Sequence, residues 1–115
     1  MMGLTIWHNP RCSKSRQTLQ LLRDRGVEPE IVEYLKDVPS EAEIRAVLGM
    51  LGIAPRALMR TGEAVYKELG LKDVADADAL IAAMAAHPIL IERPVVINNG
   101  KAALGRPPED VLTIL

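Results

Sequence analysis

The single cysteine of this chain, Cys12, is the residue best suited to carry chemistry. It lies between an apolar segment that predicts a strand and a segment that predicts a helix, with Lys14 and Arg16 following in the first helical turn. The positive end of a helix and neighbouring cationic side chains both favour the thiolate, which is the nucleophilic form of cysteine. We therefore predict a reactive thiol. The alternative is a structural cysteine that packs as a small apolar residue.

The residues that follow Cys12 predict a binding site for an oxyanion. Backbone N–H groups in the first turn of a helix have no helical partner, and such turns bind tetrahedral anions. The candidate binding side chains are Ser13, Lys14, Ser15 and Arg16.

His8 lies four residues before Cys12, at the end of the predicted strand. A cationic or hydrogen-bonding imidazole there would lower the pKa of the thiol, which makes His8 a candidate catalytic residue. The alternative is a structural histidine whose hydrogen bonds are satisfied at the end of the strand. His87 precedes Pro88 at a predicted helix end, and we expect it to be a cap or a surface residue.

Three arginines are predicted to lie at the ends of elements: Arg60, Arg93 and Arg106. Converging guanidinium groups would hold a tetrahedral dianion by bidentate, charge-assisted hydrogen bonds. Their spacing alone leaves open whether they converge or are solvated on the surface, as most arginines are.

Composition narrows the class of protein. The chain has 115 residues, enough for one domain with its own core, and a net charge of −1, which argues against a general nucleic-acid binder. One cysteine excludes an internal disulfide, no group of residues resembles a zinc site, and a free thiol suits a reducing compartment. We see no signal peptide and no apolar stretch long enough for a bilayer. We expect a cytoplasmic monomer that binds no metal and no membrane.

The predicted elements begin with a strand at 4–8, a helix at 13–25 ended by Gly26, and a strand at 30–35. Two strands joined by a helix predict a parallel pair with a right-handed crossover. Helical segments follow: 40–52, which begins with the capping-box pattern of Ser40 and Glu43, then 55–60, 63–69 ended by Gly70, and 77–86.

The end of the chain predicts a hairpin and a last helix. Val95–Ile97 is a buried-strand run, Asn99-Gly100 is a turn signal, and 101–104 completes the hairpin. Pro107 and Pro108 predict a helix start, with Val111, Leu112 and Leu115 facing inward. The fold class is therefore α/β, with a four-stranded mixed sheet and helices on its faces. Cys12 then lies at the carboxyl end of a parallel strand, where α/β proteins place their sites.

Several stretches resemble the glutaredoxin-coupled arsenate reductases of the ArsC type, and they run in the family's order from residue 4 to residue 115. The matching stretches are His8-Asn9-Pro10-Arg11-Cys12 with Ser15-Arg16 and Thr18-Leu19, Arg56-Ala57-Leu58-Met59-Arg60, 66–71, 87–94 and Gly105-Arg106-Pro107-Pro108. The resemblance implies a thioredoxin-like fold as a single domain, 1–115, with a helical insertion at about 40–87. It also implies a cis peptide bond between Arg93 and Pro94.

The resemblance implies roles for the site residues as well. Cys12 would attack arsenate, His8 would help to ionise the thiol, and Arg60, Arg93 and Arg106 would hold the oxyanion. Glutathione would act as co-substrate and glutaredoxin as partner, with no bound cofactor. The lack of a second cysteine independently requires an outside thiol. The best-studied members have Gly-Thr after the cysteine, whereas this chain has Ser13-Lys14. In this respect the chain resembles the YfgD-like branch of the family.

Two other functions remain open. A glutathione-dependent thiol oxidoreductase acting on another substrate, such as a protein mixed disulfide, would use the same thiol. The related Spx proteins share the fold and regulate transcription through RNA polymerase, but Ser15 occupies the position of the second cysteine of their switch.

Overall fold

The computed structural model describes residues 3–115, which form two compact units. The sheet unit contains the chain up to Asp37 and from Arg93 to Leu115, and the helical unit is Val38–Glu92. The helical unit contains the whole of the predicted insertion at 40–87. That the chain is a single domain stays a prediction.

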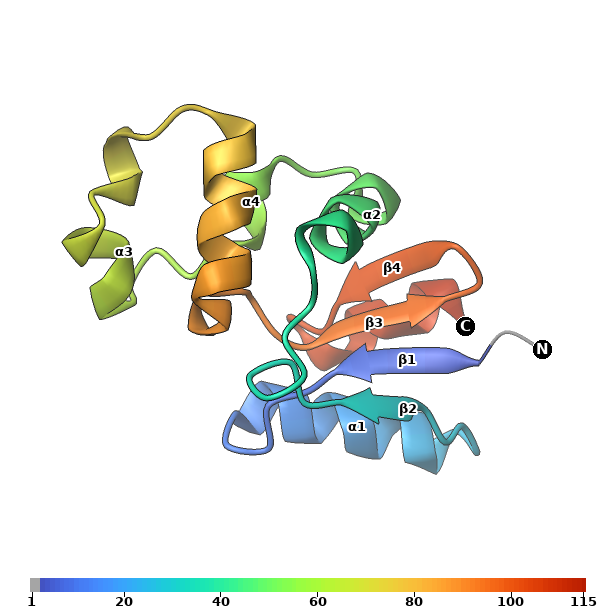
Figure 1. Cartoon of the computed structure of the whole chain (residues 1–115). Coiled ribbons are helices and arrows are strands. Elements are labelled where there is room, and N and C mark those ends of the chain that lie inside the picture. The colour runs from blue at the N-terminus through green and yellow to red at the C-terminus, as the bar shows by residue number, and fades with distance from the viewer. Residues whose placement is uncertain (1–2) are drawn as a thin grey trace. The chain divides into compact units, whose positions relative to one another are not determined.

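The sheet unit begins with the predicted strand–helix–strand unit. Strand β1 (Leu4–Trp7) leads through helix α1 (Ser13–Asp24) to strand β2 (Glu30–Val32), which pairs with β1 in parallel (Figure 1). Gly26 ends the helical segment with a positive φ of 77°, as predicted. β2 is shorter than expected because the N–H groups of Lys36 and Asp37 both donate to the carbonyl of Glu33 and turn the chain.

A hairpin completes the sheet. Strands β3 (Val95–Asn98) and β4 (Lys101–Leu104) are joined by Asn99 and Gly100, whose φ values of 56° and 81° suit the predicted Asn-Gly turn. β3 pairs antiparallel to both β1 and β4, so the strand order is β2-β1-β3-β4. The predicted α/β fold class with a four-stranded mixed sheet is confirmed.

The last helix is a 3₁₀ helix, η4 (Pro108–Ile114). Val111 is buried as predicted and Leu112 is partly buried, but the inward position expected for Leu115 is wrong. Leu115 lies past the last turn and is exposed, and Ile114 packs against the core in its place.

One core cluster joins β1, β3, α1 and η4. Its buried members are Leu4, Ile6, Leu19, Leu22, Val96 and Val111. Leu4 and Ile6 lie two residues apart and therefore share a face of the strand, while Leu19 and Leu22 share a face of the helix. The cluster places α1 and η4 on the same face of the sheet and fixes the start of α1, where Cys12 lies.

The helical unit is built from short helices. They are α2 (Glu41–Leu51), η1 (Pro55–Leu58), α3 (Ala64–Glu68), η2 (Leu71–Asp73), α4 (Ala77–Ala86) and η3 (Pro88–Leu90). The predicted capping box is present: the Glu43 N–H donates to Ser40 Oγ at 3.1 Å, and the Ser40 N–H donates to Glu43 Oε1 at 2.9 Å. The two 3₁₀ turns η2 and η3 were not predicted.

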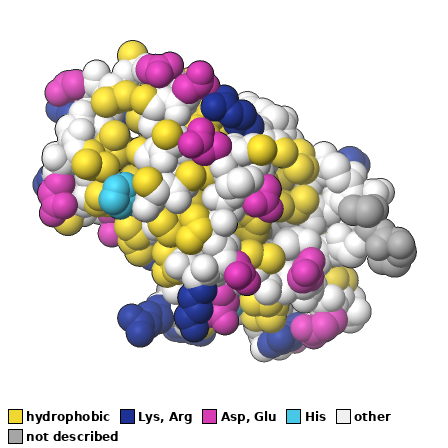
Figure 2. Space-filling model, in the orientation of Figure 1, with side chains coloured by type: hydrophobic (Ala, Val, Ile, Leu, Met, Phe, Trp, Pro, Cys, Tyr) yellow, Lys and Arg dark blue, Asp and Glu magenta, His cyan; other side chains and the backbone are white. Residues whose placement is uncertain are grey.

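The surface agrees with the small net charge. Figure 2 shows acidic and basic side chains scattered among apolar ones on the face that it presents. No helix within residues 3–115 is both long enough and apolar enough to cross a membrane.

Candidate functional site

Cys12 lies where the chain leaves β1 and enters α1, and it is the N-cap residue of that helix. The loop before it is held by local hydrogen bonds. The Cys12 N–H donates to the Asn9 carbonyl at 3.0 Å, and the Arg11 N–H donates to Asn9 Oδ1 at 3.0 Å. The thiol is therefore presented by a fixed turn at the start of a helix, half-buried and unpaired with any other cysteine.

The surroundings of the Cys12 thiol favour its ionised form. Burial raises the pKa of Cys12, but hydrogen bonds from the Ser15 backbone, the Arg93 side chain and the Lys14 backbone outweigh it, and the charge of Arg93 adds to them. The net effect lowers the pKa of the thiol below its usual value. Backbone N–H groups at the start of α1 and the Arg93 guanidinium together account for this lowering.

Two of the predicted arginines lie beside the thiol. Arg106 Nη2 approaches Cys12 Sγ at 3.8 Å, and Arg106 Nε donates to the Arg93 carbonyl at 2.9 Å. Arg93 also has two buried nitrogens, Nε and Nη1, with no hydrogen-bond partner among the described residues. Buried guanidinium donors without a partner are costly, so they mark a place where an anion would be stabilised.

Prolines follow both arginines. The Arg93–Pro94 peptide bond is cis, as the family resemblance implies. The Arg106–Pro107 bond is cis as well, which was not predicted.

Gly105 allows the loop before Arg106 to approach α1 closely. The Gly105 N–H donates to the Pro94 carbonyl at 3.0 Å. A Cβ at this position would lie 2.7 Å from Pro94 Cγ and would collide with Thr18 Oγ1. The lack of a side chain at residue 105 therefore lets the chain bring Arg106 to the thiol, a role that sequence reasoning missed.

His8 and Ser15 form a buried pair behind the thiol loop. Ser15 Oγ lies 2.6 Å from His8 Nδ1 and accepts a hydrogen bond from the Asn9 N–H at 3.0 Å. Burial lowers the pKa of His8, as do the charges of Arg23 and Arg16, while Glu33 acts in the opposite direction. The neutral imidazole is favoured, so the cationic form that the sequence suggested is disfavoured by burial.

The other predicted residues of the loop differ in which hydrogen-bonding groups are available to an anion. The Ser15 hydroxyl is buried and engaged with His8 and Asn9, so Ser15 faces the thiol through its backbone N–H. Arg16 Nη1 donates to the Pro10 carbonyl at 2.9 Å and so braces the loop. The side chains of Ser13 and Lys14 are exposed at the start of α1.

The third predicted arginine, Arg60, belongs to the helical unit. Its Nε donates to Glu63 Oε2 at 3.0 Å and its Nη1 to Glu92 Oε1 at 3.1 Å. Burial opposes the charge of Arg60, but these two carboxylates raise its pKa. The convergence of Arg60 on the thiol stays a prediction.

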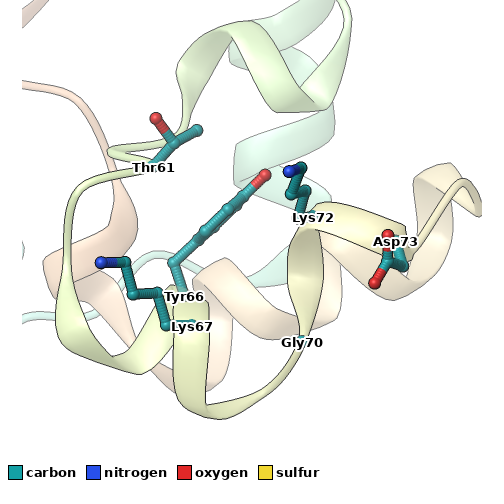
Figure 3. A pocket seen from close by; sticks show the side chains of 6 residues that line it. All are labelled: Thr61, Tyr66, Lys67, Gly70, Lys72 and Asp73. Atoms are coloured by element: carbon teal, nitrogen blue, oxygen red, sulfur yellow. The ribbon is translucent and has the colours of Figure 1, made fainter.

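The helical unit has a separate cavity of about 550 Å³, shown in Figure 3. The Tyr66 ring projects into it between Thr61 and Lys72 (Figure 3). Arg56 Nη1 donates to the Tyr66 hydroxyl at 2.5 Å and holds the ring in place. None of the predicted site residues lines this cavity. His87 is exposed at the end of α4, as expected.

Comparison with known proteins connects this geometry to a family. The model of the ArsC family matches residues 7–114. The uncharacterized protein YfgD of Escherichia coli K12 is 54% identical over 112 residues, which cover 96% of this chain and 94% of that protein. An arsenate reductase of Neisseria meningitidis serogroup A is 49% identical over 117 residues, with all of both chains covered.

Solved structures agree with the sequence relatives. An arsenate reductase from Vibrio cholerae superposes with a TM-score of 0.96 at 52% identity, covering 99% of this chain and 98% of the other. A putative arsenate reductase from Yersinia pestis superposes with a TM-score of 0.92 at 51% identity, covering 96% and 99%.

Proposed function

Since the chain belongs to the ArsC family, we propose that it is an arsenate reductase that uses the Cys12 thiolate, with glutathione and glutaredoxin as reductants. Relatives that are about half identical over their full length carry the name arsenate reductase. The proposal includes a monomer that needs no metal or bound cofactor. It also includes the cytoplasm as the location, because glutathione keeps thiols reduced there.

One observation carries the proposal: a thiol with a lowered pKa is contacted by two guanidinium groups, one of which has buried donors without a partner among the described residues. Arg93 and Arg106 would hold the oxygens of a tetrahedral dianion while the same charges keep sulfur ionised. The backbone N–H groups of Lys14 and Ser15 would also bind the oxygens of the dianion and stabilise the thiolate.

In the first step, the Cys12 thiolate attacks the arsenic of bound arsenate. A sulfur–arsenic bond forms, one arsenic–oxygen bond breaks, and the oxygen leaves as hydroxide, which takes up a proton to become water. Arg93 and Arg106 stabilise the negative charge that the oxygens carry during this exchange. His8 would hold the Ser15 hydroxyl in position, and that hydroxyl accepts a hydrogen bond from the Asn9 N–H of the thiol loop. His8 would therefore position the loop without touching the substrate.

In the second step, the sulfur of glutathione attacks Cys12 Sγ. A disulfide bond forms, the sulfur–arsenic bond breaks, and its electron pair stays on arsenic, which leaves as trivalent arsenite. The glutathione thiol gives up its proton to the departing oxygens. A glutaredoxin thiolate then attacks the glutathione sulfur of the mixed disulfide and restores the Cys12 thiolate. Cys12 is the only cysteine of the sequence, which supports a proposal in which each reducing thiol comes from another molecule.

A coupled assay tests this function. NADPH oxidation would be followed with arsenate, glutathione, glutaredoxin and glutathione reductase, using the wild-type protein and Cys12→Ser. We expect arsenate-dependent oxidation that Cys12→Ser abolishes, because a serine hydroxyl has no comparable anion near neutral pH. Absence of arsenate-dependent oxidation in a wild-type protein with a titratable thiol would refute arsenate reduction. It would favour a thiol oxidoreductase acting on another substrate.

A further inference from the structure

A groove on the sheet unit begins beside the thiol and runs along α1. Its volume is about 410 Å³, within the range of sites for small molecules. One wall is a stripe of α1 that includes Lys14, Gln17, Leu21 and Asp24. These positions are spaced by three, four and three residues and therefore share one side of the helix. The opposite wall is Pro107 together with the first residues of η4, Pro108 and Glu109.

One end of the groove adjoins Cys12. The Lys14 backbone hydrogen-bonds to the thiol, and the Lys14 side chain lines the groove. Arg106, which approaches Cys12 Sγ at 3.8 Å, is followed directly by Pro107 of the other wall. A molecule held in this groove therefore lies close to Cys12 in the chain's own geometry, because Lys14 of one wall contacts the thiol and Pro107 of the other wall follows Arg106.

The groove offers charges of both signs and an amide. Lys14 Nζ forms no ion pair with any residue of the described chain, and neither does the Glu109 carboxylate. Gln17 has no side-chain hydrogen bond within residues 3–115. Leu21, Pro107 and Pro108 supply apolar surface between these groups. This set suits a short zwitterionic peptide.

We propose that this groove is the subsite for glutathione, an inference that rests on the proposed function. Glutathione carries carboxylates, one ammonium group and two amide groups around its thiol. A carboxylate would pair with Lys14, an amide would bond to Gln17, and the ammonium would face Glu109. The stripe from Lys14 to Asp24 spans about 15 Å at the rise of an α-helix, longer than an extended tripeptide of roughly 10 Å.

A titration of wild-type protein with S-methylglutathione tests the subsite without any turnover. Its blocked thiol forms no disulfide, so only reversible binding is observed. We expect saturable chemical-shift changes in the backbone amides of Lys14, Gln17, Leu21 and Glu109. No saturable changes, or changes confined to the separate cavity lined by Pro10 and Lys36, would overturn the subsite.

Kinetics of matched variants give a second test. Glu109→Gln is expected to raise the KM for glutathione about two- to fivefold, the range for one exposed ion pair, with the KM for arsenate unchanged. Asp110→Asn is the control, because Asp110 is exposed in the same first turn of η4 but does not line the groove. Equal effects of the two variants would contradict the proposal. If the wild type reduces no arsenate, the proposed function fails, and the titration alone decides the subsite.

Discussion

At the scale of single residues, the state of Cys12 results from opposing contributions. Burial disfavours the thiolate, while backbone N–H groups and the Arg93 guanidinium favour it and prevail. The sequence predicts the helix start and the cationic neighbours of α1, because these are local. It does not reveal that Arg93 acts more strongly on the thiol than His8, since that depends on how distant segments pack.

Arg93→Gln is expected to move the ionisation of Cys12 to higher pH. The wild-type pKa is lowered, so the thiolate is present at lower pH than in an ordinary cysteine, and removing Arg93 takes away both a hydrogen bond and a charge. The rate of iodoacetamide alkylation against pH measures the midpoint, because only the thiolate reacts. Arg25→Gln, with the same change of charge at the far end of α1, is the control. A midpoint that Arg93→Gln leaves unmoved would refute the role of Arg93.

Ser15→Ala is expected to destabilise the fold by about 1–3 kcal/mol, because it leaves the buried Asn9 N–H and His8 Nδ1 without their partner. Chemical denaturation measures the loss. Ser13→Ala, an exposed serine two residues earlier, is the matched control and should stay within about 0.5 kcal/mol of wild type. Equal stability of the two variants would show that the Ser15 hydroxyl is not structural.

At the scale of elements, local signals identify the elements well and their ends less well. The capping box at Ser40, the left-handed glycines at 26 and 52, and the Asn-Gly turn are fixed by neighbours in sequence, and all are present. The end of β2 and the exposure of Leu115 depend on where contacts with the rest of the fold stop. The spacing of apolar residues along the sequence carries no information on this. The close approach at Gly105 needs three segments at once, so the sequence gives no sign of it.

Gly105→Ala is expected to cost about 1–3 kcal/mol through overpacking, because the new methyl would meet Pro94 and Thr18. It should also weaken arsenate binding by displacing Arg106. Gly49→Ala is the contrasting control, because nothing lies within 4 Å of the place that a Cβ would take at residue 49. In the interior of α2, alanine in place of glycine should raise the free energy of unfolding by about 0.5–1 kcal/mol. Thermal unfolding of both variants measures the difference, and a neutral Gly105→Ala would contradict the packing account.

At the scale of the whole molecule, one unit supplies most of the predicted chemistry. Cys12, Arg93 and Arg106 all belong to the sheet unit, although 94 positions separate the first from the last. The family resemblance predicts this convergence, whereas spacing alone leaves it open. Arg60 belongs to the helical unit, where Glu63 and Glu92 hold it.

The intact mass of the protein after incubation with arsenate and glutathione, without glutaredoxin, shows whether Cys12 attacks arsenic before glutathione reacts. The proposed mechanism predicts one glutathione joined by a disulfide to Cys12, formed only when arsenate is present and absent from Cys12→Ser. The mixed disulfide should disappear when glutaredoxin is added. A protein that stays unmodified, or that takes up glutathione equally without arsenate, would contradict a mechanism in which Cys12 first attacks arsenic.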